Sequence, residues 1–204
     1  MKIKRWLVGV CLLAAGVVLI AGSFAVLSAA AQTSAKQAAP AAAKDEMIAR
    51  GKYVMNAGSC HDCHSPKTMT AQGPVPDATR ILSGHPAGEK LPPFKKEDIG
   101  PEKWVLFSPG FTASVGPWGV VCSQNLTPDE NTGIGLWTEE MFKSALRTGK
   151  HMGMGRPISP PMPWAAVGGL SDEDLAAVYA YLKSIPPIKN AVPGPLSVED
   201  YLAK

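Results

Sequence analysis

Cys60-His61-Asp62-Cys63-His64 is the stretch from which the rest of this chain can be interpreted. It has the pattern C-x-x-C-H, the attachment signature of a c-type haem. Two thiols that lie two residues apart on a short helical turn can each form a thioether with one vinyl group of haem. The His that follows can direct a ring nitrogen at the iron as an axial ligand. The stretch therefore predicts one covalently bound haem c, attached through Cys60 and Cys63, with His64 on the iron.

Other uses of two nearby cysteines fit this sequence less well. A bare C-x-x-C also occurs in redox dithiols and as half of a zinc site. Zinc would need further ligands at short spacing, but His85, His151 and Cys122 are distant in the sequence. A thioredoxin-like site would need a βαβ pattern, which the sequence does not show. We interpret Cys122 as a buried free thiol, because free Cys packs as a small hydrophobe.

A second axial ligand is needed if the iron is to transfer electrons rather than to bind small molecules. The candidates are His and Met residues along the chain, namely Met69, His85, His151, Met152, Met154 and Met162. Met thioether is the usual soft partner of His in cytochromes c. Met162 lies in Pro160-Pro161-Met162-Pro163-Trp164, where three prolines restrict the backbone and lower the cost of ordering a ligand. We therefore predict Met162 as the second ligand; Met152, Met154, a His or an open site remain alternatives.

Residues 1–31 have the features of an export segment. A basic start is followed by the apolar run Trp6–Leu27, and Ala29-x-Ala31 matches a signal-peptidase site. The run is longer than the ~7–15 residues of a usual signal core and close to the ~20 residues that span a bilayer. The segment is therefore either a signal peptide or an uncleaved N-terminal membrane anchor. Both alternatives place residues 32–204 outside the cytoplasm, because the positive end stays inside.

The rest of the chain divides into a linker, a domain and a tail. Residues 32–44 are Ala-rich and predict a flexible linker, residues 45–188 a single domain, and residues 189–204 a C-terminal tail. From Asp45 onward 15 basic residues face 17 acidic ones, so the predicted domain is close to neutral. No nucleic-acid partner is indicated by this balance.

The expected fold class is all-α, with helices around one haem. A first helix should run from Asp45 toward the haem motif. Two later helices should be capped by Thr138 and Ser171, which stand before acidic first turns. Between the motif and the penultimate helix, residues 65–136 are rich in Pro and Gly and show little helical periodicity. They predict a long irregular insertion, with short strands only weakly indicated around 104–107 and 120–122.

At this point the chain resembles the class I c-type cytochromes. The resemblance rests on the helix that ends in the haem motif, on the Pro-flanked Met162, and on the final helix with Ala180-Tyr181-Leu182-Lys183. In that family a Gly on the first helix meets an aromatic residue on the last, which implies a contact between Gly51 and Tyr181 here.

A narrower likeness, to cytochrome c subunits that accompany bacterial membrane dehydrogenases, rests on three stretches within residues 118–188. These are Asn125-Leu126-Thr127-Pro128-Asp129, Thr132-Gly133-Ile134-Gly135 with Trp137, and Pro161-Met162-Pro163-Trp164. Members of that group often carry two or three C-x-x-C-H motifs, whereas this chain has one, which implies a single haem.

The resemblance implies an electron carrier rather than an enzyme. It would work on the periplasmic side of the bacterial inner membrane, anchored by its N-terminal segment or soluble after cleavage. Its partners would be a dehydrogenase as donor and an oxidase or another protein as acceptor. Two alternatives remain open: a haem enzyme or gas-sensing domain with a displaceable distal ligand, and a non-catalytic electron-transfer subunit of a membrane dehydrogenase complex.

Overall fold

The computed structural model describes residues 42–203. The predicted export segment over residues 1–31 and most of the predicted linker lie outside these residues. From Met47 onward the chain forms one compact unit. None of the helices in the described part is long and apolar enough to cross a membrane.

The helix before the haem motif covers residues 42–57. It is helical from the first described residue, three positions before the expected start at Asp45. Residues 42–44 are Ala-Ala-Lys, and both residue types are strong helix formers, so the helix extends in front of Asp45. The haem motif itself forms a separate short helix, α2 (Cys60–His64), which begins after Ser59 in the left-handed conformation (φ 54°).

The later helices follow the haem motif along the chain, and two of them begin at the capping residues expected from the sequence. They are α3 (Glu139–Thr148), α4 (Trp164–Gly168), α5 (Asp172–Ser184) and α6 (Val198–Leu202), together with the short 3-10 helices η1 (Lys96–Asp98) and η2 (His151–Gly153). Thr138 accepts a hydrogen bond from the backbone N–H of Met141, and Ser171 accepts one from that of Asp174. Both predicted N-caps are therefore confirmed.

The expectation of an all-α fold is wrong in part, because two small antiparallel sheets lie within residues 65–136. β1 (Lys67–Thr70) and β2 (Gly73–Pro76) form a hairpin. β3 (Leu106–Phe107), β4 (Ala113–Gly116) and β5 (Gly119–Cys122) form a sheet in the order β3-β4-β5. The strands have only two to four residues each, which is too short for a periodic pattern to stand out in the sequence.

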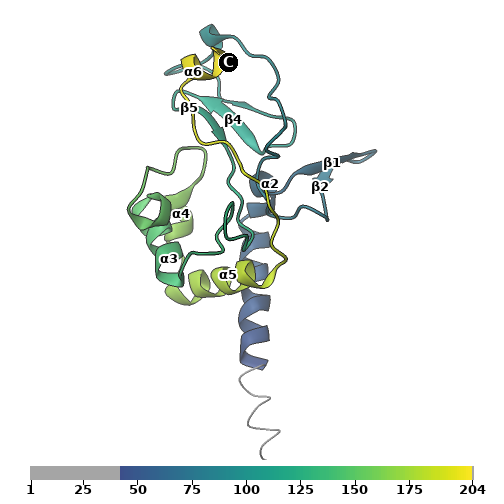
Figure 1. Cartoon of the computed structure of the whole chain (residues 1–204), viewed down its shortest axis with the longest axis vertical. Helices are drawn as coiled ribbons and strands as arrows, with labels where there is room; N and C mark the ends of the chain where they lie inside the picture. Colours follow the sequence, from purple (N-terminus) through teal and green to yellow (C-terminus); the bar gives the residue numbers. More distant parts are fainter. Residues whose placement is uncertain (1–41, 204) are drawn as a thin grey trace, which may run out of the picture. The chain divides into compact units, whose positions relative to one another are not determined.

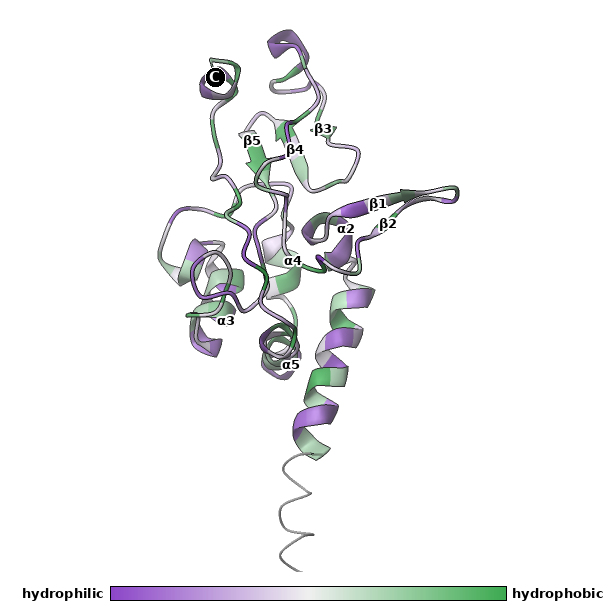
Figure 2. Cartoon of the chain, turned by 45° about the vertical axis from the view of Figure 1, so that its right-hand side comes forward, coloured by the Kyte–Doolittle hydropathy of each residue, from purple (hydrophilic) through white to green (hydrophobic). Residues whose placement is uncertain are grey.

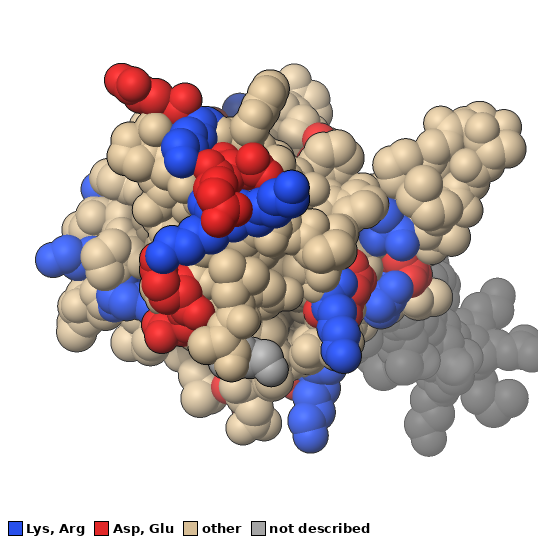
Figure 3. All heavy atoms as spheres, turned by 90° about the horizontal axis from the view of Figure 1, so that it is seen from above, with Lys and Arg blue, Asp and Glu red and all other residues tan. Residues whose placement is uncertain are grey.

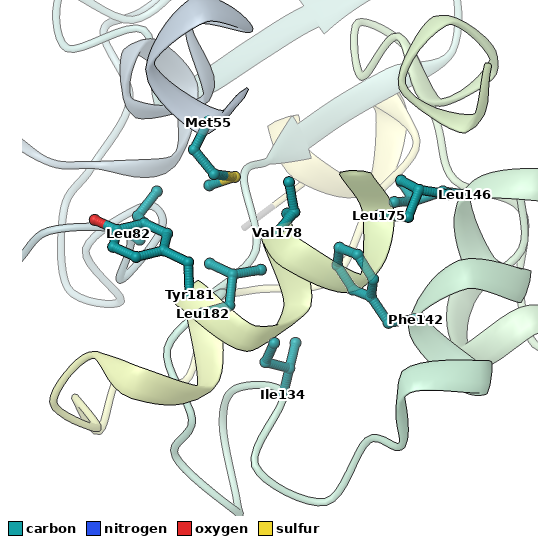
Figure 4. Packing of buried hydrophobic residues seen from close by; sticks show 9 residues of the cluster. All are labelled: Met55, Leu82, Ile134, Phe142, Leu146, Leu175, Val178, Tyr181 and Leu182. Carbon is teal, nitrogen blue, oxygen red and sulfur yellow. The ribbon is translucent and has the colours of Figure 1, made fainter. Parts of the chain in front are cut away.

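The helices share one main hydrophobic core, centred on α5. Its buried members are Met55, Leu82, Ile134, Phe142, Leu146, Leu175, Val178, Tyr181 and Leu182. Figure 4 shows Met55, Leu82 and Tyr181 on one side of this cluster and Phe142 and Leu146 on the other. A smaller cluster of Val115, Val120 and Val198 joins the three-stranded sheet to α6.

Helix α2 lies between these two groups of elements. Figure 1 shows α3, α4 and α5 on one side of α2, and β4, β5 and α6 on the other. The C-terminal tail runs back along the sheet, where Val120 and Leu196 exchange hydrogen bonds of 2.9 and 3.0 Å. The tail thereby covers one edge of β5, a strand coloured strongly hydrophobic in Figure 2.

Charged side chains of both signs are interleaved on the surface. On the face shown in Figure 3, Lys and Arg side chains lie beside Asp and Glu side chains. One such pair joins Lys96 of η1 to Glu199 of α6, with 2.8 Å between nitrogen and oxygen. Exposed pairs of this kind contribute at most about 1 kcal/mol to stability.

The contact between Gly51 and Tyr181 that the resemblance implied is confirmed. A methyl group placed on Gly51 would overlap the carbonyl oxygen of Ala177 in α5 and lie 2.9 Å from Cβ of Tyr181. Gly at this position therefore allows the backbones of the first helix and α5 to approach closely. The packing gained by this approach outweighs the cost of about 1 kcal/mol for a Gly within a helix.

We expect Gly51→Ala to lower the free energy of unfolding by about 1–3 kcal/mol, because the added methyl meets a backbone carbonyl that cannot give way. Denaturant unfolding of the purified protein, followed by circular dichroism, measures the change. Gly88→Ala is the matched control, since its methyl would meet nothing within 4 Å. Equal stability of the two variants would contradict this account of the helix contact.

Candidate functional site

His64 is held by a backbone carbonyl 60 residues further along the chain. Its Nδ1 lies 2.8 Å from the carbonyl oxygen of Gln124. A carbonyl oxygen can only accept, so Nδ1 carries the proton and Nε2 keeps its lone pair. Burial lowers the pKa of His64, which favours this neutral form. A neutral imidazole whose other nitrogen is held by a carbonyl is the usual state of a metal-ligating His.

Two segments of the insertion, around residues 84–85 and 123–124, lie next to this hydrogen bond. The N–H of Gly84 donates to the carbonyl of His64 (2.8 Å), and the N–H of His85 donates to that of Ser123 (2.9 Å). Gly84 has a positive φ of 79°, and a methyl on it would lie 2.7 Å from the carbonyl carbon of Gln124. Gly84 therefore lets the two segments pass one another next to the haem motif.

Ser65 connects the end of α2 to the same part of the insertion. It is fully buried. Its hydroxyl accepts the N–H of Leu82 at 2.9 Å and lies 3.2 Å from Nδ1 of His61. Residues 64–65 are thus fixed by both segments of the insertion, which were predicted from the sequence only as irregular chain.

The two motif cysteines are free, half-buried thiols on α2. Burial raises the pKa of both Cys60 and Cys63. Cys60 also packs against the main hydrophobic core. Among the described residues, no group of three or more His, Cys, Asp or Glu side chains is arranged to hold a metal ion.

Met162 packs against the same core cluster as Cys60. Its loop is held by the end of α3. The aromatic ring of Trp164 lies where a side chain on Gly149 would be, and the N–H of Ile158 donates to the carbonyl of Gly149 at 2.8 Å. Arg147 donates to the carbonyl of Gly168, at the end of α4. The segments before and after Met162 are therefore both attached to one helix end.

The other candidate ligands are placed differently. His85 is buried, its Nδ1 lies 2.9 Å from the hydroxyl of Thr112, and its Nε2 lies 3.4 Å from the carbonyl of Glu89. Met69 and Met154 are exposed, by 69% and 85%. His151 packs its ring edge-on against Trp137, with centroids 5.0 Å apart. Met152 is half-buried in η2, with a positive φ of 55°. Unlike Met162, none of these five packs against the core cluster that Cys60 borders.

A model of the cytochrome c family matches residues 48–186, which is more than half of the chain. The chain belongs to the cytochrome c family. The match covers the haem motif and the Met162 loop, so the resemblance to c-type cytochromes drawn from the sequence is confirmed. The residues of α2 fit a c-type haem: two free thiols stand at the family spacing, and His64 has the tautomer that a ligand needs.

Relatives of this cytochrome are named as parts of dehydrogenases. Gluconate 2-dehydrogenase cytochrome c subunit of Pantoea cypripedii is 30% identical over 79% of this chain and 30% of its own length. Fructose dehydrogenase cytochrome subunit of Gluconobacter japonicus is 30% identical over 78% of this chain and 26% of its own. Alcohol dehydrogenase (quinone), cytochrome c subunit, of Gluconobacter oxydans is 30% identical over 68% and 21%.

The chain therefore spans less than a third of the length of these relatives. Their names confirm the resemblance to cytochrome subunits of bacterial dehydrogenases. Together with the family match, they support a role in electron transfer.

Cys122 is a buried thiol in β5, and burial raises its pKa to about 11. At pH 8 only about one such thiol in a thousand is ionised, against about a quarter for an ordinary Cys. We expect iodoacetamide to alkylate Cys122 at pH 8 at least about a hundredfold more slowly in the folded protein than in guanidinium chloride. Peptide mass spectrometry measures both rates. A folded-state rate that matches the unfolded one would show that Cys122 is accessible.

Proposed function

We propose that this chain is a monohaem electron carrier, not an enzyme in its own right. Cys60 and Cys63 would attach the haem, and His64 and Met162 would be its axial ligands. The observation that carries this proposal is the hydrogen bond from Nδ1 of His64 to Gln124, which leaves Nε2 available as an iron ligand. Met162 is favoured because it is the candidate that shares a core cluster with Cys60.

When bound with both axial positions filled, the haem would supply one-electron exchange between the ferrous and ferric states of its iron, with no substrate transformed. The protein's part is to keep both ligands in place while this happens. The carbonyl of Gln124 holds the orientation and the protonation state of His64. The attachment of the Met162 loop to the end of α3 restrains the thioether. The apolar side chains around Cys60 and Met162 exclude water, which disfavours the extra charge of the ferric state.

The proposed donor is a dehydrogenase, and the proposed acceptor is an oxidase or another redox protein. The dehydrogenase is suggested by the relatives, which are named as cytochrome subunits of dehydrogenases. An electron-transfer subunit of a dehydrogenase complex is a second form of the same proposed function. The proposed location, the periplasmic side of the inner membrane, rests on the basic and apolar pattern of residues 1–31.

Met162→Ala should open the iron, so that the reduced protein binds carbon monoxide, and it should lower the reduction potential, since Met ligation raises the potential of a His-ligated haem. Absorption spectra with and without carbon monoxide and a redox titration measure these changes. Met154→Ala is the matched control, because Met154 is exposed. If Met154→Ala opens the iron and Met162→Ala does not, the ligand assignment is wrong.

The same spectra separate the carrier from the alternative of a gas sensor or haem enzyme. The reduced wild-type protein should not bind carbon monoxide, and its ferric form should be low-spin. Ready binding together with a high-spin ferric spectrum would favour a displaceable distal ligand and would overturn the carrier.

The native protein should contain one haem per chain and should purify with a dehydrogenase. Pyridine haemochrome absorbance per mole of protein measures the haem count, and mass spectrometry of the complex identifies the partner. N-terminal sequencing of the mature chain decides between a cleaved signal and an anchor. Two haems per chain, or a chain kept in the cytoplasm, would contradict the proposed function.

A further inference from the structure

Lys67 lies next to the haem-attachment helix and donates to two of its backbone carbonyls and to the carbonyl of Ser65, just after the helix. Its ammonium nitrogen is 3.0 Å from the carbonyl oxygen of His61, 2.8 Å from that of Asp62 and 2.7 Å from that of Ser65. An ammonium group has three N–H donors, so every donor of Lys67 has a partner on the last turn of α2 or just after it. The sequence gives no sign of this, because Lys67 follows the motif as an ordinary polar residue.

The β1–β2 hairpin holds Lys67 in this position. Lys67 is the first residue of β1 and is paired with Pro76 of β2. The strands are closed at that end by a hydrogen bond of 2.8 Å from the N–H of Asp77 to the carbonyl of Pro66. The side chain is half-buried, and burial lowers the pKa of Lys67. The backbone of Lys67 is thus fixed independently of the contacts that its side chain makes.

The last carbonyls of a helix have no partners within the helix and form the negative end of its dipole. α2 has only five residues, so these carbonyls are a large part of it. Lys67 binds two carbonyls of α2, those of His61 and Asp62, and the carbonyl of Ser65 just after it. Its positive charge therefore offsets the negative end of the helix beside His64, and its hydrogen bonds fix the last turn, on which Cys63 and His64 stand.

We propose that Lys67 is a positioning residue for the haem ligand His64 and that its charge favours the reduced state of the iron. This inference rests on the proposed function. The ferrous state carries one positive charge less than the ferric state, so a fixed cation nearby destabilises the ferric state more. Removing Lys67 takes away that cation and also exposes the negative end of α2, and both changes favour oxidation.

The test compares Lys67→Met, which keeps most of the length but loses the charge, with Lys67→Arg, which keeps the charge. Lys52→Met is the matched control, because Lys52 is an exposed lysine on the helix just before the motif. Each variant is purified with its haem, and its midpoint potential is measured by spectroelectrochemistry. Lys67→Met should shift the reduction equilibrium toward the ferric form by about threefold, the scale for a cation at a helix C-terminus.

Lys67→Arg should shift the equilibrium less than Lys67→Met, and Lys52→Met should shift it less than twofold. Equal shifts in Lys67→Met and Lys52→Met would overturn the inference. If Lys67→Met yields no haem-loaded protein, Lys67→Arg decides: haem loading at close to the wild-type potential supports the role of the charge, and a complete loss of haem overturns it. A wild-type protein that carries no haem would instead refute the proposed function.

Discussion

The hydrogen bond between Nδ1 of His64 and the carbonyl of Gln124 is the constraint on which the rest of the structure depends. The haem motif can place a His next to two thiols, but it cannot decide which ring nitrogen carries the proton. That decision requires a carbonyl from elsewhere in the chain. In this chain Gln124 supplies that carbonyl 60 residues after His64, and the insertion between them brings it next to the motif.

This requirement gives residues 65–136 a structural purpose. The insertion's segments around Gly84 and Gln124 enclose the end of α2. The C-terminal tail is bound to these segments as well. The amide of Asn190 donates to the carbonyls of Ser83 (2.7 Å) and His85 (2.8 Å), which ties the tail to the first of these segments.

Asn125 shows how a polar side chain can organise such irregular chain. It is buried, and its amide nitrogen donates to the carbonyl of Ile188 at 2.7 Å. Its side-chain oxygen accepts both the N–H and the hydroxyl of Thr127, at 2.9 and 2.8 Å. A buried amide with all these partners stabilises one loop conformation, because leaving any of them unpaired would cost about 1–3 kcal/mol. The resemblance to dehydrogenase cytochromes included Asn125, and the structure supplies its physical role.

Much of the helical part could be predicted from the sequence, because its signals are local. Thr138 and Ser171 mark helix starts by their side-chain chemistry, and Gly51 could be paired with Tyr181 through the family pattern. β4 could not be predicted, because its four residues, Ala-Ser-Val-Gly, are too few and too small to distinguish a strand from a loop. Gln124 acts through its backbone carbonyl, which every residue possesses, so no residue type reveals it. The role of Lys67 depends on the hairpin that holds it, and that hairpin was not predicted either.

The two sides of the proposed iron site are supported by different kinds of contact. His64 is held through main-chain groups of Gln124 and Gly84, which a substitution at position 124 would leave in place. The Met162 loop has one main-chain hydrogen bond, from Ile158 to Gly149, and otherwise depends on side chains, with Trp164 against Gly149 and Arg147 on the end of α4. A substitution at residue 124 would therefore keep the carbonyl that holds His64, although it would remove the hydrogen bonds from the Gln124 side chain to the carbonyls of Cys122 and Pro193. Substitutions at positions 147, 149 or 164 would instead remove contacts that hold the Met162 loop, so the two sides of the proposed iron site differ in their tolerance to mutation.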